Sequence, residues 1–134
     1  MRPRLLGRLP VEGEWILEPD PAVIHAGLIR VLAESLGASQ LDASIAYLAS
    51  ADNPGTALVA SYRVMGSMPY HEKRLREALR LRGIGHLTVK KRGFPLSPEE
   101  VQRRLHLRGD QDGTIALTSI QGRHVAILLD AYRA

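Results

Sequence analysis

From position 57 onward, the apolar residues change their spacing several times along the chain. A two-residue alternation, typical of strands, covers residues 86–92, 114–120 and 124–130, and residues 57–65 predict a strand because they are rich in small and β-favouring residues. The wider spacing of helices covers residues 70–82 and 97–107. This β-α-β-α-β-β order predicts an α/β (α+β) fold with helices packed on a small mixed sheet. We expect right-handed crossovers to bring the early strands together in parallel.

Local capping and turn residues support this order. Ser97-Pro98-Glu99-Glu100 combines an N-cap serine, a proline at the first helical position and a glutamate at the third, which is a capping box. Gly83 is a natural stop for the helix over residues 70–82. The Gln121-Gly122 pair lies between two alternating apolar runs and predicts a β-hairpin.

An amphipathic helix is predicted ahead of this segment, over residues 21–36. Asp20 is a good N-cap, Pro21 suits the first helical position and Gly37 ends the pattern. The apolar arc is wider than a surface helix needs. Either this is the central helix of the domain, or its second face docks a partner. The candidate docking residues are Val23, Ile24, Leu28, Val31 and Leu32.

Composition excludes several classes of protein. The chain has 134 residues, enough for one domain, and no cysteine, which excludes a disulfide scaffold and a thiolate zinc site and fits the cytoplasm. No apolar run approaches the roughly 20 residues that a membrane span requires. The basic start is not followed by an apolar stretch, so we predict no signal peptide and treat residues 1–12 as a linker or arm.

The usual catalytic and cofactor motifs are missing. The sequence contains no GxGxxG, no GxxxxGK[ST] and no GxSxG, and its five histidines lack the spacing of metal ligands. Arg82-Gly83-Ile84-Gly85 follows a helix rather than a strand, which favours a helix C-terminus over a phosphate-binding turn. We therefore predict no catalytic residue, no cofactor-binding residue and no metal ligand in this chain.

Positive charge is concentrated in one third of the sequence. Residues 63–108 hold 12 lysines and arginines against four aspartates and glutamates, a net charge of +8, whereas the whole chain carries +4. Such a block is typical of a surface that faces a polyanion. The alternative is a solvated face that keeps the protein soluble. The aromatic residues are few, so contacts with the phosphate backbone are favoured over base stacking.

Three basic clusters are candidates for contact with nucleic acid. Lys73, Arg76 and Arg80 share one face of the helix over residues 70–82. Lys90-Lys91-Arg92 ends a strand beside Gly93 and could clamp a phosphate, or could protect an edge strand against aggregation. The third cluster consists of Arg103, Arg104 and Arg108.

Several stretches resemble a known family. Residues 18–28, Glu18 to Leu28, resemble the segment that follows the catalytic domain in a family of bacterial S-adenosylmethionine-dependent methyltransferases. The THUMP-like domain that ends those proteins is similar to residues 73–76, 87–93 and 105–109 and to the final hairpin. The resemblance covers residues 13–130.

This resemblance implies a ferredoxin-like or connecting segment over residues 13–66 and a THUMP-like domain over residues 67–134. It also implies an accessory, substrate-recognition domain that binds RNA (tRNA or rRNA) and works with a methyltransferase catalytic domain, in cis or in trans. The S-adenosylmethionine cofactor of the family belongs to a Rossmann-like domain that these residues do not contain. Two alternatives stay open: a protein-interaction module that docks a partner through the helix over residues 21–36, and a small stand-alone enzyme.

Overall fold

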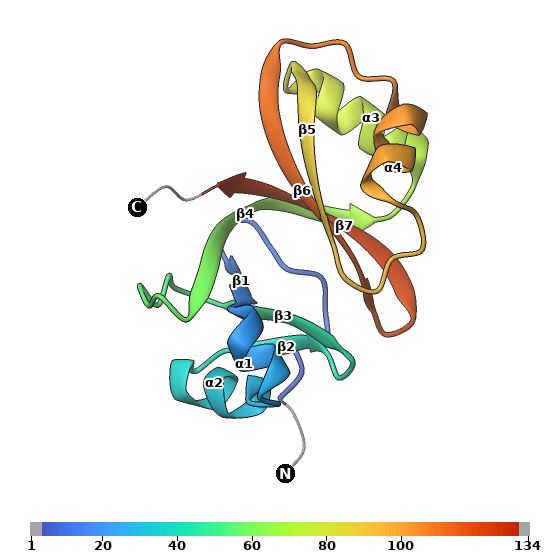
Figure 1. Ribbon diagram of the computed structural model, residues 1–134. Coiled ribbons are helices and arrows are strands. Elements are labelled where there is room, and N and C mark those ends of the chain that lie inside the picture. The colour runs from blue at the N-terminus through green and yellow to red at the C-terminus, as the bar shows by residue number, and fades with distance from the viewer. Residues whose placement is uncertain (1–3, 132–134) are drawn as a thin grey trace.

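The computed structural model describes residues 4–131, and within them seven strands form one mixed sheet (Figure 1). The strand order is β2-β3-β1-β4-β7-β6-β5. The strands are β1 (Trp15–Pro19), β2 (Ser39–Asp42), β3 (Ile45–Ser50), β4 (Val59–Pro69), β5 (Ile84–Lys91), β6 (Gln111–Ile120) and β7 (Arg123–Ala131). The helices are α1 (Pro21–His25), α2 (Ile29–Leu36), α3 (Glu72–Leu81) and α4 (Pro98–Leu105).

The predicted β-α-β-α-β-β order is confirmed from β4 to β7. The crossover through α4 places β5 directly beside β6 in parallel. The crossover through α3 does not make neighbours of β4 and β5, because β7 and β6 lie between them. The predicted hairpin at Gln121-Gly122 joins β6 to β7. Since β4 crosses position 66, the proposed boundary between residues 13–66 and 67–134 stays a prediction.

The prediction of one helix over residues 21–36 was wrong in detail. Gly27 has a left-handed φ of 71° and separates α1 from α2. This conformation suits glycine, which lacks a Cβ. The sequence also gave no indication of β1 or β2, although β1 lies in the middle of the sheet between β3 and β4. Residues 4–6 pair with the edge strand β2 through hydrogen bonds between Leu6, Arg4 and Gln40.

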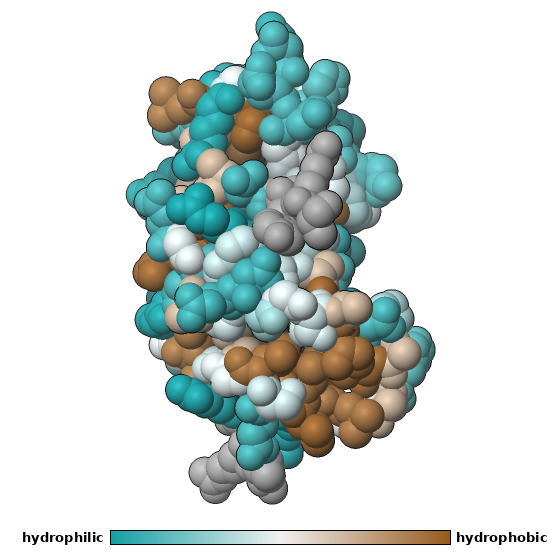
Figure 2. Space-filling model, turned by 90° about the vertical axis from the view of Figure 1, so that its left-hand side faces the viewer, coloured by the Kyte–Doolittle hydropathy of each residue, from teal (hydrophilic) through white to brown (hydrophobic). Residues whose placement is uncertain are grey.

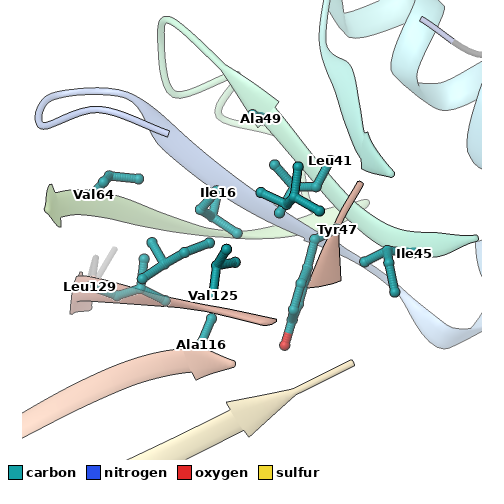
Figure 3. Close-up of a cluster of buried hydrophobic side chains, with 11 residues drawn as sticks. Ile16, Leu41, Ile45, Tyr47, Ala49, Val64, Ala116, Val125 and Leu129 are labelled. Carbon is teal, nitrogen blue, oxygen red and sulfur yellow. The ribbon is translucent and has the colours of Figure 1, made fainter. Parts of the chain in front are cut away.

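The sheet curls so that three apolar cores form. One core lies on the concave face, where Tyr47, Ile16, Val64 and Leu129 meet (Figure 3). A second lies beneath α3 and α4, and a third beneath α1 and α2. The curl brings β2 close to β6: the carboxylate of Asp42 accepts a hydrogen bond from the Gln121 backbone at 3.0 Å.

Two ends of the molecule result from this arrangement (Figure 1). Helices α3 and α4 lie beside β5 and β6 at one end, and α1 and α2 lie beside β1, β2 and β3 at the other. None of the helices in the described residues has the length and apolar character to cross a membrane. The same residues contain no cluster of potential metal ligands.

Candidate nucleic-acid interface

Each helix at the basic end begins at a side-chain cap. Ser97 Oγ accepts a hydrogen bond from the Glu100 backbone at 3.1 Å, as the capping box predicts, and Pro98 is the first residue of α4. His71 Nδ1 accepts from the Arg74 backbone at 3.3 Å and caps α3. Both helices bury one apolar stripe, Leu75 and Leu79 in α3 and Val101 and Leu105 in α4. Their remaining surface is left for charged residues.

Arginines of α3 hold the C-terminus of α4. Arg76 donates from Nε to the Leu105 carbonyl at 3.0 Å and from Nη2 to the Arg104 carbonyl at 2.8 Å. Arg80 Nη2 donates to the His106 carbonyl at 3.1 Å. The last carbonyls of a helix lack partners within the helix and carry partial negative charge, so a guanidinium there stabilises the helix end. Arg76 and Arg80 therefore have a structural role as well as a charge.

The α4 arginines share one carboxylate. Arg103 and Arg104 both form ion pairs with Glu100, and Arg104 also lies 3.8 Å from a carboxylate oxygen of Glu72 on α3. Hydrogen bonds from Arg103 and Arg104 lower the pKa of Glu100 below its ordinary value. These two arginines and two glutamates balance each other in charge, so any net positive charge here comes from the other basic residues of the two helices and their ends.

Two predicted residues on this side have no partner among residues 4–131, Lys73 on α3 and Arg108 after α4. The same is true of Arg74 and Arg82, which the clusters predicted from sequence did not include. All four side chains are exposed. The structure thus brings together the first and third predicted clusters. We define the α3–α4 face as Lys73, Arg74, Arg76, Arg80, Arg103, Arg104 and Arg108.

The second predicted cluster lies elsewhere and its charges have partners. Lys90 and Arg92 point to the concave face of the sheet, where Glu18 of β1 lies 3.2 Å from Lys90 Nζ and 4.0 Å from Arg92 Nε. Lys90 also lies over the ring of Tyr62, with Nζ 5.0 Å from the ring centroid, and Arg92 lies over Tyr47. Burial alone would lower the pKa of Lys90, but Tyr62 and Glu18 raise it and favour the ammonium.

Lys91 points the other way and closes a loop. Its Nζ donates to the carbonyls of Phe94 and Leu96 at 3.3 and 3.1 Å. Phe94 itself is 7% exposed and packs edge-on against Tyr70 and His124, so its ring is not available for stacking on a base. β5 is an edge strand, as the alternative interpretation of Lys90-Lys91-Arg92 requires.

The five predicted docking residues also separate. Leu32 is buried in the core beneath α1 and α2, and Val23 packs against that core. Leu28 and Val31 are 47% and 62% exposed, and Ile24 is half-buried. Apolar side chains gather over this end of the molecule (Figure 2). We define the apolar patch as Ile24, Leu28 and Val31.

Comparisons with known proteins agree on one relationship. The family model described as THUMP domain-like matches residues 59–131. Two curated relatives, uncharacterized S-adenosylmethionine-dependent methyltransferases from two Mycobacterium tuberculosis strains, are 38% identical to this chain over 108 residues. A crystal structure of a provisionally assigned methyltransferase from Porphyromonas gingivalis W83 shares the fold, with a TM-score of 0.78 and 21% sequence identity.

These relatives are much longer than the chain. The match covers 81% of this chain but 30% of each Mycobacterium tuberculosis protein. For the Porphyromonas gingivalis structure, the coverage is 96% of this chain and 32% of that chain.

Proposed function

The chain belongs to the THUMP domain-like family, and from this premise we propose that it is the accessory substrate-recognition domain of an S-adenosylmethionine-dependent methyltransferase and that it binds RNA. The α3–α4 face is the observation that carries this proposal. Six of its seven basic residues lie on two adjacent helices and Arg108 follows the second, and the described partners of these residues are backbone carbonyls and two glutamates. Such a surface positions a phosphate backbone and does not itself read sequence.

The residues of this chain do not fit S-adenosylmethionine. The sequence has no glycine-rich turn between a strand and a helix, and the glycines after α3 are already packed against backbone. A Cβ on Gly85 would collide with the Gly109 carbonyl, and a Cβ on Gly109 would collide with Gly83. These glycines permit two loops to approach each other and leave no cradle for a cofactor. In our proposal, the cofactor and the methyl transfer belong to the part of the methyltransferase outside this chain.

The test removes charge from the α3–α4 face without touching its structural arginines. In a Lys73→Gln/Arg108→Gln double variant, two exposed side chains lose their charge, and neither has a partner in residues 4–131. We expect RNA affinity to fall about tenfold and the slope of log affinity against log salt to flatten by about 1 to 2, because two phosphate contacts are lost. Fluorescence anisotropy with labelled tRNA over a salt series measures both quantities.

A matched control removes the same charge elsewhere. Arg4 and Arg123 are exposed, and their side chains have no partner among the described residues. An Arg4→Gln/Arg123→Gln variant should bind RNA within about twofold of the unmodified protein, since these residues lie outside the α3–α4 face. Equal losses in both double variants would show unspecific attraction, and RNA binding that does not depend on salt would contradict the proposal.

The apolar patch favours a second role for the same domain. Leu28, the N-cap of α2, is about half exposed, and Val31 on α2 is mostly exposed, whereas Leu32 and Ala33 of the same helix are buried. Contiguous exposed apolar residues mark interaction sites. The partner in this proposal is the catalytic part of the methyltransferase, in cis or in trans.

A further inference from the structure

A pocket of about 360 Å³ lies where the C-terminal end of α3 meets β4, β7 and the start of β6. Its apolar floor consists of Met65, Leu79, Ile84 and Leu128. Met65 is half-buried, and the other three are at least nine-tenths buried. An apolar pocket with a few polar groups at its rim is the usual form of a ligand site.

Strand alternation places the polar groups of the rim. Leu128 belongs to the core beneath α3, and Asp130, two residues further along β7, therefore faces the same side of the sheet. Gly113 in the facing strand adds no side chain, and a Cβ there would meet Ile84 Cδ1 at 2.6 Å. Gln111 and Arg82 add a carboxamide and a guanidinium to the rim, and Asp112 and Thr114 of β6 also line the pocket. Alternation along β6 places Gln111 and Gly113 on the same side of the sheet as Asp130, and Asp112 and Thr114 on the other. The pocket is thus open above an apolar floor, with the Asp130 carboxylate on the floor's side of the sheet.

The charged groups of the rim are not engaged with each other. Within residues 4–131, neither Arg82 nor Asp130 has an ion pair or a side-chain hydrogen bond, and both side chains are exposed. Gln111 donates from Nε2 to Asp110 at 3.2 Å, which leaves its carbonyl oxygen as an acceptor. Arg82 is two residues from Arg80 of the α3–α4 face, so a bound strand that contacts α3 can reach this rim.

We propose that this pocket binds the base of an unpaired guanosine in the RNA, an inference that rests on the proposed function. The floor accepts the flat apolar faces of a base, which single-stranded RNA can turn outward. A phosphate does not suit the pocket, because Asp130 would repel it. Arg82 is placed for the phosphate beside the bound base.

Guanine follows from the chemistry of the carboxylate. The two oxygens of Asp130 accept hydrogen bonds and donate none. Guanine carries an imino N–H and an amino group side by side, which match two acceptor oxygens. Adenine and cytosine offer one amino group each on that edge, and the single imino N–H of uracil lies between two carbonyl oxygens that a carboxylate repels. We therefore expect affinity to decrease from guanine through adenine and cytosine to uracil.

The experiment uses four labelled hexaribonucleotides that differ at one central position. Fluorescence anisotropy should show about tenfold tighter binding of the guanine hexamer than of the uracil hexamer, the size expected for one bidentate contact to a base. Asp130→Asn should reduce this ratio to less than about twofold, because the amide no longer supplies two acceptors. Asp52→Asn is the matched control: Asp52 is an exposed carboxylate outside the pocket, its side chain has no partner within residues 4–131, and its variant should keep the full ratio.

The outcomes separate the two proposals. Equal binding of all four hexamers, or a guanine preference that survives Asp130→Asn, overturns the pocket while RNA binding stands. Failure to bind any hexamer or tRNA overturns the proposed function. A direct readout is independent of RNA affinity: guanosine 5′-monophosphate should shift the methyl NMR signals of Met65 and Leu128. Unchanged signals at saturating nucleotide would overturn the pocket.

Discussion

Lys90 and Arg92 show how much a basic residue depends on the groups that surround it. By composition they belong to the densest positive cluster of the chain, yet both face a carboxylate across the concave side of the sheet. Glu18 lies on β1 in the interior of the sheet. Lys90 lies near the end of the edge strand β5, and Arg92 follows that strand. Their ion pairs therefore link distant parts of a curled sheet. Buried Tyr47 packs beside them, and burial raises the pKa of its phenol, so the ring stays neutral.

The substitution Glu18→Gln tests this role. We expect it to lower the free energy of unfolding by about 1 kcal/mol, because two partly buried cations lose their carboxylate while the amide keeps one acceptor. Urea denaturation measures the change. Glu12→Gln removes an exposed carboxylate that has no partner among residues 4–131 and should change stability by less than about 0.5 kcal/mol. If Glu18→Gln lowered stability no more than Glu12→Gln does, the ion pairs of Glu18 with Lys90 and Arg92 would not stabilise the fold.

RNA affinity separates this structural role from the alternative of phosphate binding. Should Lys90 and Arg92 contact phosphate, Glu18→Gln would free them and strengthen RNA binding. Their partners in the fold lead us to expect an affinity within about twofold of the unmodified protein. The same anisotropy measurement with tRNA decides between the two.

At the scale of the elements, Asp42 ties one turn to another. Its carboxylate accepts from the Gln121 backbone at 3.0 Å and from the Ser44 backbone and hydroxyl at 3.2 and 3.1 Å. The contact with Gln121 joins the β2–β3 turn to the β6–β7 turn, and those with Ser44 fix the carboxylate within its own turn. Burial works to raise the pKa of Asp42, but the N–H groups of Gln121 and Ser44 lower it below the ordinary value.

This lowered pKa predicts a pH-dependent contribution to stability. A carboxyl whose pKa is lower in the folded state stabilises the fold above its ordinary pKa of about 4, and the contribution is lost as the pH falls through the lowered value. Asp42→Asn should cost about 1 kcal/mol at pH 7, and this difference should shrink as the pH falls below the ordinary pKa and through the lowered one. Glu14 and Glu100 also have lowered pKa values, so the difference between the two proteins is the quantity to measure. A stability difference between the two proteins that stays constant with pH would contradict a stabilising role for the Asp42 carboxylate.

The elements that sequence predicted are those with local determinants. The cap at Ser97, the stop at Gly83 and the turn at Gln121-Gly122 each act within a few residues, and the elements beside them are confirmed. β1 was not predicted because its five residues are too few to show a clear strand pattern. Its pairing with β3 and β4 depends on residues far along the chain. Most of the α3–α4 face could be predicted from sequence, because helical spacing places its basic residues on two neighbouring helices. Glu18, 72 positions from Lys90, was not predicted as its partner, because nothing local reveals that contact.

At the scale of the whole molecule, the two proposed surfaces lie at opposite ends (Figure 1). The α3–α4 face covers one end and the apolar patch the other, with β4 and β7 between them. Charge follows the same division, since residues 63–108 carry +8 and residues 1–62 hold four basic against seven acidic residues, a net −3. In the proposed function, a domain arranged in this way holds RNA at its basic end while it is packed on the catalytic part at the other.

This separation predicts that the two surfaces can be disrupted independently. Leu28→Ser/Val31→Ser should leave RNA affinity within about twofold, because the substitutions lie outside the α3–α4 face. The fold should tolerate them, since both side chains are 47% exposed or more.

Association with the separately produced catalytic part of a family methyltransferase should weaken about tenfold or more in this variant, because two apolar contacts are lost. Isothermal titration calorimetry measures this association. Leu81→Ser is the control, because Leu81 is 89% exposed on α3 at the other end. Equal association by both variants would contradict docking through the apolar patch, whereas a loss confined to Leu28→Ser/Val31→Ser would place the catalytic part on α1 and α2.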